Sequence, residues 1–387
     1  MFASLPFLTS TQVLRLLREN TITVEAYAAS LLERIKERDG IVKAWTYLDM
    51  PTEFGSPIYQ GHQPGFDSSA VAILRAAGAL IFVTNSGPNT TNPWDPNRTP
   101  GGSSCGSAAA VADFQVPLSL GTQTGGSIIR PASYTGVFAM KPTHEAVSTE
   151  GQKAFAPTFD TFGFFARSVE DLQLLADIFG LKDDGSPKDM PLKEMSVAIM
   201  KTPMWSQAGP GTVAAMEKAT AILRDGGIEV AEVPFPDQIS DPDALKDIQN
   251  KITRGEAQAA FLREYRVCRL VENHSNYTRK EIVEASDTYS EMRRSMNRLA
   301  ENYSVILTPS AVDEAPLGLG DMGAATFNTM WTGFHMPVIN IPAFVGINEM
   351  PVGVSLVAPR FRDQHLLQVS KIVGDRLIAE GGCKPRD

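Results

Sequence analysis

The strand and helix pattern between residues 196 and 233 constrains the fold more than any other feature of the chain. A short apolar strand is expected at residues 197–200, a helix at 213–224 and a second strand at 228–233. A strand–helix–strand unit sets its two strands parallel and lays the helix on one face of the sheet. We therefore expect a sheet with parallel strands and a helical layer.

The same alternation continues along the rest of the chain. Thr23 has the residue type and position of a helix N-cap, which divides residues 11–38 into two helices. Further helices are expected at 68–77, 107–112, across much of 244–301 and at 366–377, and further strands at 79–83, 305–308, 338–341 and 352–357. No repeat or low-complexity segment divides the sequence. The prediction is one α/β domain with a mixed sheet.

Composition limits the classes of partner. The 387 residues carry a formal net charge of −9, and phosphate binding needs a basic surface, so we expect neither a nucleic acid nor an anionic membrane as partner. Three widely spaced cysteines indicate a reducing compartment, and residues 1–8 lack the basic start of a signal peptide, which together favour the cytoplasm. The five histidines are isolated from other ligand types, so no metal is expected, and no organic cofactor is implied.

Two segments rich in glycine and serine carry the chemical signal. They are Pro-Gly-Gly-Ser-Ser-Cys-Gly-Ser at 100–107 and Gly-Thr-Gln-Thr-Gly-Gly-Ser at 121–127, and both read as loops. Flexible turns are one interpretation. A phosphate-binding loop is disfavoured, because neither segment ends in Gly-Lys-Ser/Thr. The third interpretation is nucleophilic catalysis: Gly125 and Gly126 let successive amides point into one pocket beside the hydroxyl of Ser127. Ser103, also preceded by two glycines, offers a second hydroxyl.

The two segments together resemble the amidase signature. The sequence reads Gly-Gly-Ser-Ser-x-Gly-Ser-Ala-Ala-Ala-Val-Ala and then Leu-Gly-Thr-Gln-Thr-Gly-Gly-Ser-Ile-Ile-Arg-Pro-Ala. The resemblance continues over most of the chain, at 49–64, 92–95, 140–143, 160–163, 307–309 and 327–359. It implies a single amidase-signature domain over residues 1–387, with a central sheet covered by helices on both faces. Its parts would be an N-terminal helical part (1–40), a signature core (68–165), a βαβ and helical insertion (196–310) and a C-terminal part (311–387).

The resemblance also implies roles for particular residues. Ser127 falls on the family's nucleophile, and Ser103 on the serine that follows a cis peptide bond and relays protons. The backbone N–H groups of Thr124, Gly125, Gly126 and Ser127 would form the oxyanion hole. Ser104 and Trp331 would contact the substrate, although Trp331 is equally well explained as a core aromatic.

One part of the family pattern is missing. The family places its catalytic lysine in a segment resembling Gly-x-Pro-x-x-x-Lys-Asp, upstream of both serines, whereas here residues 44–49 run directly into Met-Pro-Thr-Glu-Phe at 50–54. A second, shorter gap lies near 83–86, so the fold is expected to be locally truncated. Without that strand, neighbouring backbone groups need another partner or a rearranged sheet. Lys43, Lys141, Lys153 and His62 are the candidate replacement bases.

Two functions follow from these residues. The first is an amidase-like hydrolase that cleaves the C–N bond of a small carboxamide through an acyl-Ser127 intermediate, impaired by the loss of the lysine. The second is a non-hydrolytic relative that binds or transfers acyl or amide ligands. The resemblance also raises a homodimer as a candidate assembly.

Overall fold

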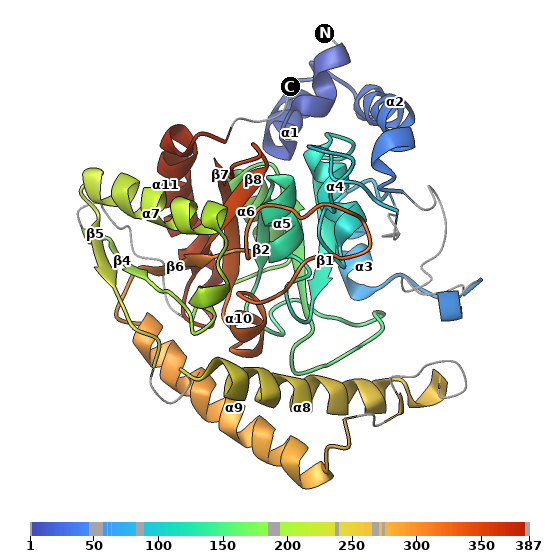
Figure 1. Cartoon of the computed structure of the whole chain (residues 1–387). Coiled ribbons are helices and arrows are strands. Elements are labelled where there is room, and N and C mark those ends of the chain that lie inside the picture. Colours follow the sequence, from blue (N-terminus) through green and yellow to red (C-terminus); the bar gives the residue numbers. More distant parts are fainter. Residues whose placement is uncertain are drawn as a thin grey trace.

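The computed structural model of the chain describes residues 2–45, 57–59, 61–62, 64–82, 89–184, 194–236, 240–264, 271–272 and 275–383. Its described strands form one eight-stranded sheet in the order β1-β3-β2-β7-β8-β6-β4-β5 (Figure 1). The strands are β1 (Leu118–Gln123), β2 (Phe138–Lys141), β3 (Thr161–Ala166), β4 (Ser196–Ile199), β5 (Glu229–Glu232), β6 (Val305–Pro309), β7 (Val338–Val345) and β8 (Pro351–Val357). β4 pairs parallel with both β5 and β6, and the other pairs are antiparallel. The predicted mixed sheet and its strand–helix–strand unit are confirmed.

Helices cover both faces of the sheet, because successive strand side chains point to opposite sides. In β2, Ala139 belongs to one buried apolar cluster and Met140 to the other. The first cluster takes in residues of α4 (Cys105–Ala112), α5 (Ile129–Thr135), α8 (Pro242–Ala260), α9 (Arg279–Ala300) and α10 (Thr329–Gly333). The second takes in residues of α3 (Ser69–Ala76), α6 (Val169–Ile178), α7 (Pro210–Asp225) and α11 (Asp363–Gly381). The helix-covered α/β architecture expected from the sequence is confirmed.

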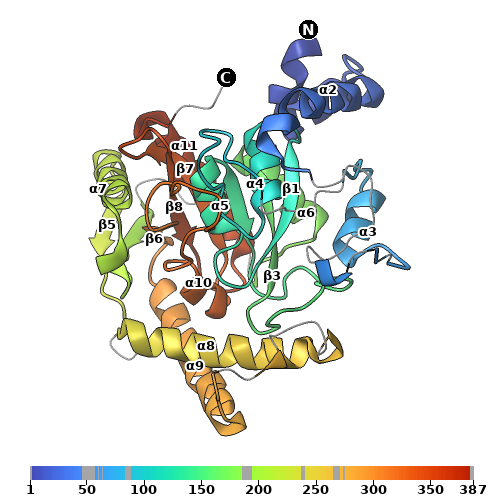
Figure 2. The same ribbon diagram turned by 45° about the vertical axis from the view of Figure 1, so that its right-hand side comes forward.

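Two helical pairs extend the body at its ends (Figures 1 and 2). At the N-terminus, α1 (Ser10–Arg18) and α2 (Val24–Val42) flank Thr23, whose hydroxyl accepts the amide of Ala26, so the predicted N-cap is confirmed. At the opposite end, α8 and α9 lie below the sheet in Figure 1. Within the described ranges, no helix is both long and apolar enough to cross a membrane.

Two expectations about local structure were wrong. Residues 79–82 form no strand: Gly78 ends α3 with φ +86°, Ala79 donates back to Leu74, and Leu80 is 59% exposed. A short apolar run does not become a strand without a neighbour to pair with, and the expected residue 83 lies outside the described residues. Residues 121–123 are not loop but the end of β1, where Gly121 pairs with Gly163 of β3. The elements β1, β2, β3, α5, α6 and α10 were not anticipated from the sequence.

β1 forms one edge of the described sheet. Among the described strands, β1 is the last in the sheet and pairs only with β3. Its residues 118–121 are half-buried and Thr122 is exposed, as expected for an edge strand. The junction at 46–56 and the second gap near 83–86 lie outside the described residues.

Candidate active site

Ser127 lies in the turn that joins β1 to α5. β1 ends at Gln123 and α5 begins at Ile129, so residues 124–128 make the turn between sheet and helix. The Gly126 carbonyl accepts the amide of Arg130 at 2.9 Å, which starts the helical hydrogen bonding. The Ser127 side chain is half-buried at this turn. It therefore sits at the surface of the core rather than inside it.

The backbone amides of this turn divide into two groups. Those of Ile128 and Ile129 donate to the side-chain oxygen of Gln123, at 2.8 and 3.0 Å. Those of residues 124–127 donate to no acceptor within the described part of the chain. Successive N–H groups without a protein partner beside a serine hydroxyl are able to donate to a developing oxyanion.

The side chain of Gln123 holds the turn at residues 124–128 in place. It is 1% exposed, and besides accepting two amides it donates from Nε2 to the hydroxyl of Thr332 at 2.9 Å. The Thr332 hydroxyl lies 2.8 Å from the Gly125 carbonyl and donates to it. The Gly125 carbonyl and the Gln123 side chain are thus paired, whereas the amides of 124–127 have no protein acceptor among the described residues.

Close packing explains Gly126. A methyl group there would lie 2.6 Å from Asn328 Oδ1 and 3.1 Å from Ala325 Cβ. A methyl group on Gly125 would lie 3.4 Å from Ala325 Cβ, an ordinary van der Waals contact, so packing does not require that glycine. Asn328 is 2% exposed and donates from Nδ2 to the Ser310 carbonyl, while its Oδ1 has no hydrogen-bond partner in the described structure.

Thr124 is held from the side by Asp160. Its hydroxyl donates to Asp160 Oδ1, and Oδ2 of the same carboxylate accepts the amides of Phe155 and Ala156 at 2.7 and 2.9 Å. Burial raises the pKa of the Asp160 carboxyl, while these hydrogen bonds act to lower it. Asp160 was singled out in the sequence only as part of a motif, and its link to Thr124 became visible only in the fold.

Ser103 follows a cis peptide bond after Gly102, as the resemblance implies. Its side chain is exposed. The Gly102 carbonyl accepts from Arg130 of α5 at 2.5 Å. Ser104 is 7% exposed, and its hydroxyl points at the Thr122 carbonyl of β1 at 3.4 Å. Ser104 is therefore turned toward the backbone of β1.

These contacts bring the two serine segments into one region. Arg130, three residues after Ser127, reaches the carbonyl next to Ser103. The segment after β6 touches both: Met322 lies against Gly102, and Ala325 against Gly126. Neither serine hydroxyl makes a hydrogen bond to another described residue.

None of the four candidate bases hydrogen-bonds either serine in the described structure. Lys141 is fully buried, donates to the Pro142 carbonyl at 2.9 Å, and burial lowers its pKa to about 7. Lys153 donates to the Ala260 carbonyl and forms an ion pair with Glu264, so its ammonium group is bound away from both serines. Lys43 is exposed at the left-handed C-cap of α2, and His62 packs edge-on to Tyr59.

Trp331 is 1% exposed on α10. Its ring packs edge-on against Phe334 and Phe235, with centroids 6.1 and 6.4 Å away. Its indole N–H has no acceptor among the described residues. This environment favours the core interpretation over a contact with substrate.

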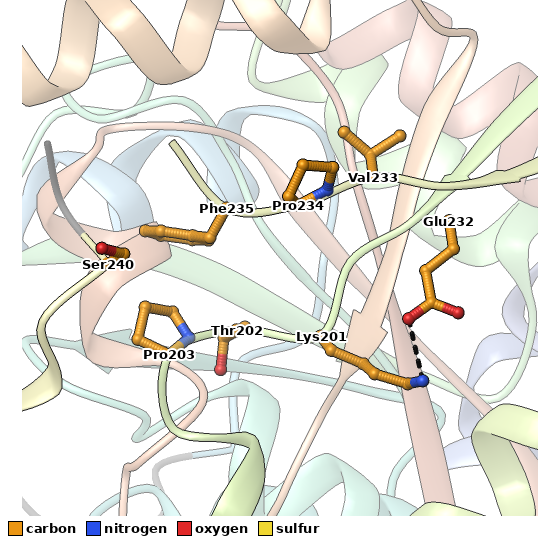
Figure 3. A pocket seen from close by; sticks show the side chains of 8 residues that line it. All are labelled: Lys201, Thr202, Pro203, Glu232, Val233, Pro234, Phe235 and Ser240. Carbon is orange, nitrogen blue, oxygen red and sulfur yellow. Dashed lines mark ion pairs between the residues drawn. The ribbon is translucent and has the colours of Figure 1, made fainter. Parts of the chain in front are cut away.

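A pocket of about 420 Å³ opens at the carboxyl ends of β4 and β5 (Figure 3). Lys201 and Glu232 form an ion pair of 2.8 Å at its edge, and Phe235 contributes a ring that also packs on Trp331. The lining includes no residue of the two serine segments. Across the described ranges, no group of three or more histidine, cysteine, aspartate or glutamate side chains is placed to hold a metal ion.

Comparison with known proteins gives consistent matches. The family model described as Amidase matches residues 44–367. A chloroplastic/mitochondrial glutamyl-tRNA(Gln) amidotransferase subunit from Oryza sativa subsp. indica is 28% identical, over 84% of this chain and 73% of the relative. The corresponding amidotransferase subunit from Deinococcus deserti is 31% identical, over 76% of this chain and 71% of the relative. The structure of 6-aminohexanoate cyclic dimer hydrolase superimposes with a TM-score of 0.84 at 20% identity, covering 98% of this chain and 99% of that one.

Proposed function

Because the chain belongs to the amidase family, whose members cleave or transfer at carbon–nitrogen bonds, we propose that it cleaves the C–N bond of a small carboxamide through an acyl-Ser127 intermediate. The observation that carries the proposal is the run of four unpaired amides at residues 124–127 beside the Ser127 hydroxyl. Amides left without partners are costly in a folded chain, unless water or a ligand accepts from them.

In the proposed reaction, the Ser127 oxygen attacks the carbonyl carbon while the carbonyl oxygen moves among the amides of Thr124, Gly125, Gly126 and Ser127. The C–N bond then breaks, and the proton released by the Ser127 hydroxyl passes through Ser103 to the leaving nitrogen. Water then attacks the acyl-serine carbonyl, one water proton restores the Ser127 hydroxyl, and the acid is released. Asp160 would act by positioning Thr124, and Gln123 by positioning the turn.

The scheme also needs a general base that takes the Ser127 proton. The described lysines and His62 make no hydrogen bond to either serine, and the junction at which the family lysine is absent lies outside the described residues. Loss of a positioned base lowers a rate by about 10²–10⁴-fold. We therefore propose slow acylation compared with a chain that keeps the lysine.

The exposed Ser103 side chain and the lack of a described base favour a second candidate, a non-hydrolytic relative that binds or transfers acyl or amide ligands. The names of the rice and Deinococcus relatives, both amidotransferase subunits, are compatible with transfer. The cytoplasmic location and the homodimer remain proposals as well: the first is supported by the three widely spaced cysteines, the second by the resemblance alone.

Covalent labelling separates the two candidates. The whole chain is exposed to a small alkyl fluorophosphonate, and the adduct is followed by intact-protein and peptide mass spectrometry. Acyl-serine chemistry requires an adduct on Ser127 that disappears in Ser127→Ala and persists in Ser119→Ala, whose hydroxyl donates to the Ser107 carbonyl away from the turn. Absence of an adduct at every pH between 6 and 10 would leave the ligand-binding candidate.

A further inference from the structure

The loop that follows β6 exposes three large apolar side chains within six residues. Leu317 is 70% exposed, Leu319 37% and Met322 49%, and we call these three the apolar rim. Single exposed apolar residues are ordinary, but a group of them beside a reactive centre marks a binding surface.

The rim lies at the Ser103 segment. A methyl group on Gly102 would lie 3.2 Å from both Cβ and Sδ of Met322, so Met322 packs directly on the residue before Ser103. In both ribbon views the chain after β6 passes over α5 (Figures 1 and 2). Met322 therefore places one end of the rim beside the Ser103 segment, and Leu317 and Leu319 lie on the same loop.

The loop is fastened at both ends, so the rim is held in place. At its start, the Gly318 amide donates to the Asn97 carbonyl at 2.8 Å, and Arg98 donates to the Ala315 carbonyl at 2.6 Å. At its end, Arg130 donates to the carbonyls of Gly323 and Gly102, at 2.6 and 2.5 Å. One guanidinium thus joins the end of the loop to the Ser103 segment.

We infer that the apolar rim binds the substituent on the leaving nitrogen, so that the chain prefers amides with an apolar amine side. The inference rests on the proposed function, in which Ser103 delivers the proton to that nitrogen. The nitrogen must then lie next to Ser103, and its substituent leaves the reaction centre past Gly102 and Met322. The acyl group is attached to the same carbonyl carbon in another direction, so the inference assigns it no contact with the rim.

Two isomeric amides test this directly. N-benzylacetamide carries its phenyl group on the amine side, and 3-phenylpropanamide carries it on the acyl side, with the same atoms in both. The chain labelled with [methyl-¹³C]methionine is titrated with each, and the Met322 resonance is assigned by its loss in Met322→Leu. N-benzylacetamide is expected to shift the Met322 methyl and to bind about tenfold more tightly than its isomer, the effect of burying roughly 60 Å² of apolar surface.

Variants sharpen the outcome. Met322→Asp is expected to remove the preference, Met322→Leu to keep it, and Ile347→Asp, at an 85% exposed apolar residue that is not part of the rim, to leave it unchanged. Equal affinities for the isomers, an equal shift of Met322 by both, or an unchanged preference in Met322→Asp overturns the inference. If Ser127 is labelled but the chain shows no preference between the isomers, only the binding role of the apolar rim is refuted. If the chain prefers N-benzylacetamide but Ser127 is not labelled, only the acyl-serine proposal is refuted.

Discussion

Replacing Gln123 with leucine should open the turn that carries Ser127. Gln123 is 1% exposed, and its side-chain oxygen is the acceptor for the amides of Ile128 and Ile129. Leucine has a similar volume and accepts no hydrogen bond. Both isoleucine residues are buried, so their amides would lose their partner where water does not readily replace it.

The size of the effect follows from these contacts. Leaving a buried donor unpaired costs about 1–3 kcal/mol, and two are affected. The leucine side chain offsets part of this cost, because burying an apolar side chain is favourable whereas burying the carboxamide group of glutamine is not. We expect a net loss of about 2–4 kcal/mol in the local free energy of opening, which corresponds to roughly 30- to 1000-fold faster exchange at 1.4 kcal/mol per factor of ten.

Hydrogen–deuterium exchange of the peptide covering residues 124–135 measures this. Gln123→Glu serves as a matched variant, because its carboxylate still accepts both amides, and it should keep most of the protection. Gln115→Leu removes a second fully buried glutamine that bonds Trp45 and Asp113 instead, and it should leave this peptide unchanged. Wild-type exchange at Ile128 and Ile129 in Gln123→Leu would show that the glutamine does not hold the turn.

Three further predictions concern other parts of the molecule. Gly126→Ala places a methyl group 2.6 Å from Asn328 Oδ1, so it should destabilise the chain by about 1–3 kcal/mol and slow Ser127 labelling; thermal unfolding and labelling rates test this, and unchanged values in both would contradict the packing argument. Burial lowers the Lys141 pKa to about 7, so the folded state binds fewer protons than the unfolded state between pH 7 and about 10, and stability should rise with pH across that window and fall as pH drops toward 7. Lys141→Met should flatten this dependence in denaturation measured at several pH values, whereas an equal rise in the variant would assign it to other groups. Thr278 caps α9 in a reciprocal capping box with Glu281, so Thr278→Ala should cost about 1 kcal/mol and increase exchange in the first turn of α9, while Thr288→Ala, on the exposed middle of the helix, should leave that turn unchanged.

Sequence reasoning located most elements whose signal is local. The strand–helix–strand unit at β4–α7–β5 and the Thr23 cap depend on periodicity and capping within one segment, and both were predicted. The strand at residues 79–83 was wrong over its described part, because an apolar run carries no information about whether a pairing neighbour exists. β1 was not predicted, for the related reason that Gly121 looks like a turn residue until it is seen opposite Gly163, with Phe165 2.7 Å from where its methyl group would lie.

For the candidate site, too, the local motif was visible in the sequence and the contacts between distant segments were not. Ser103, Ser127 and the glycines were proposed as site residues from an ordered motif, and the cis bond before Ser103 that the resemblance implied is present. The groups that hold them were missed: Asp160 reaches Thr124 across 36 residues, and Thr332 reaches Gly125 across 207. Such contacts depend on the packing of the whole sheet, and no spacing in the sequence encodes them.

The glycines and the amides do not carry equal weight as evidence for catalysis. Gly126 is required by its contact with Asn328, and Gly121 by its contacts with Phe165 and Ser104, so packing alone would keep both in a chain with no activity. The free amides are different. The side chain of Gln123 accepts the amides of residues 128 and 129. A second acceptor of this kind could pair the amides of residues 124–127, yet the described structure provides none, and Gly126 is buried. A fold under selection for stability alone gains by pairing a buried donor, so the open amide of the buried Gly126 is the observation that agrees best with the proposed oxyanion-binding role.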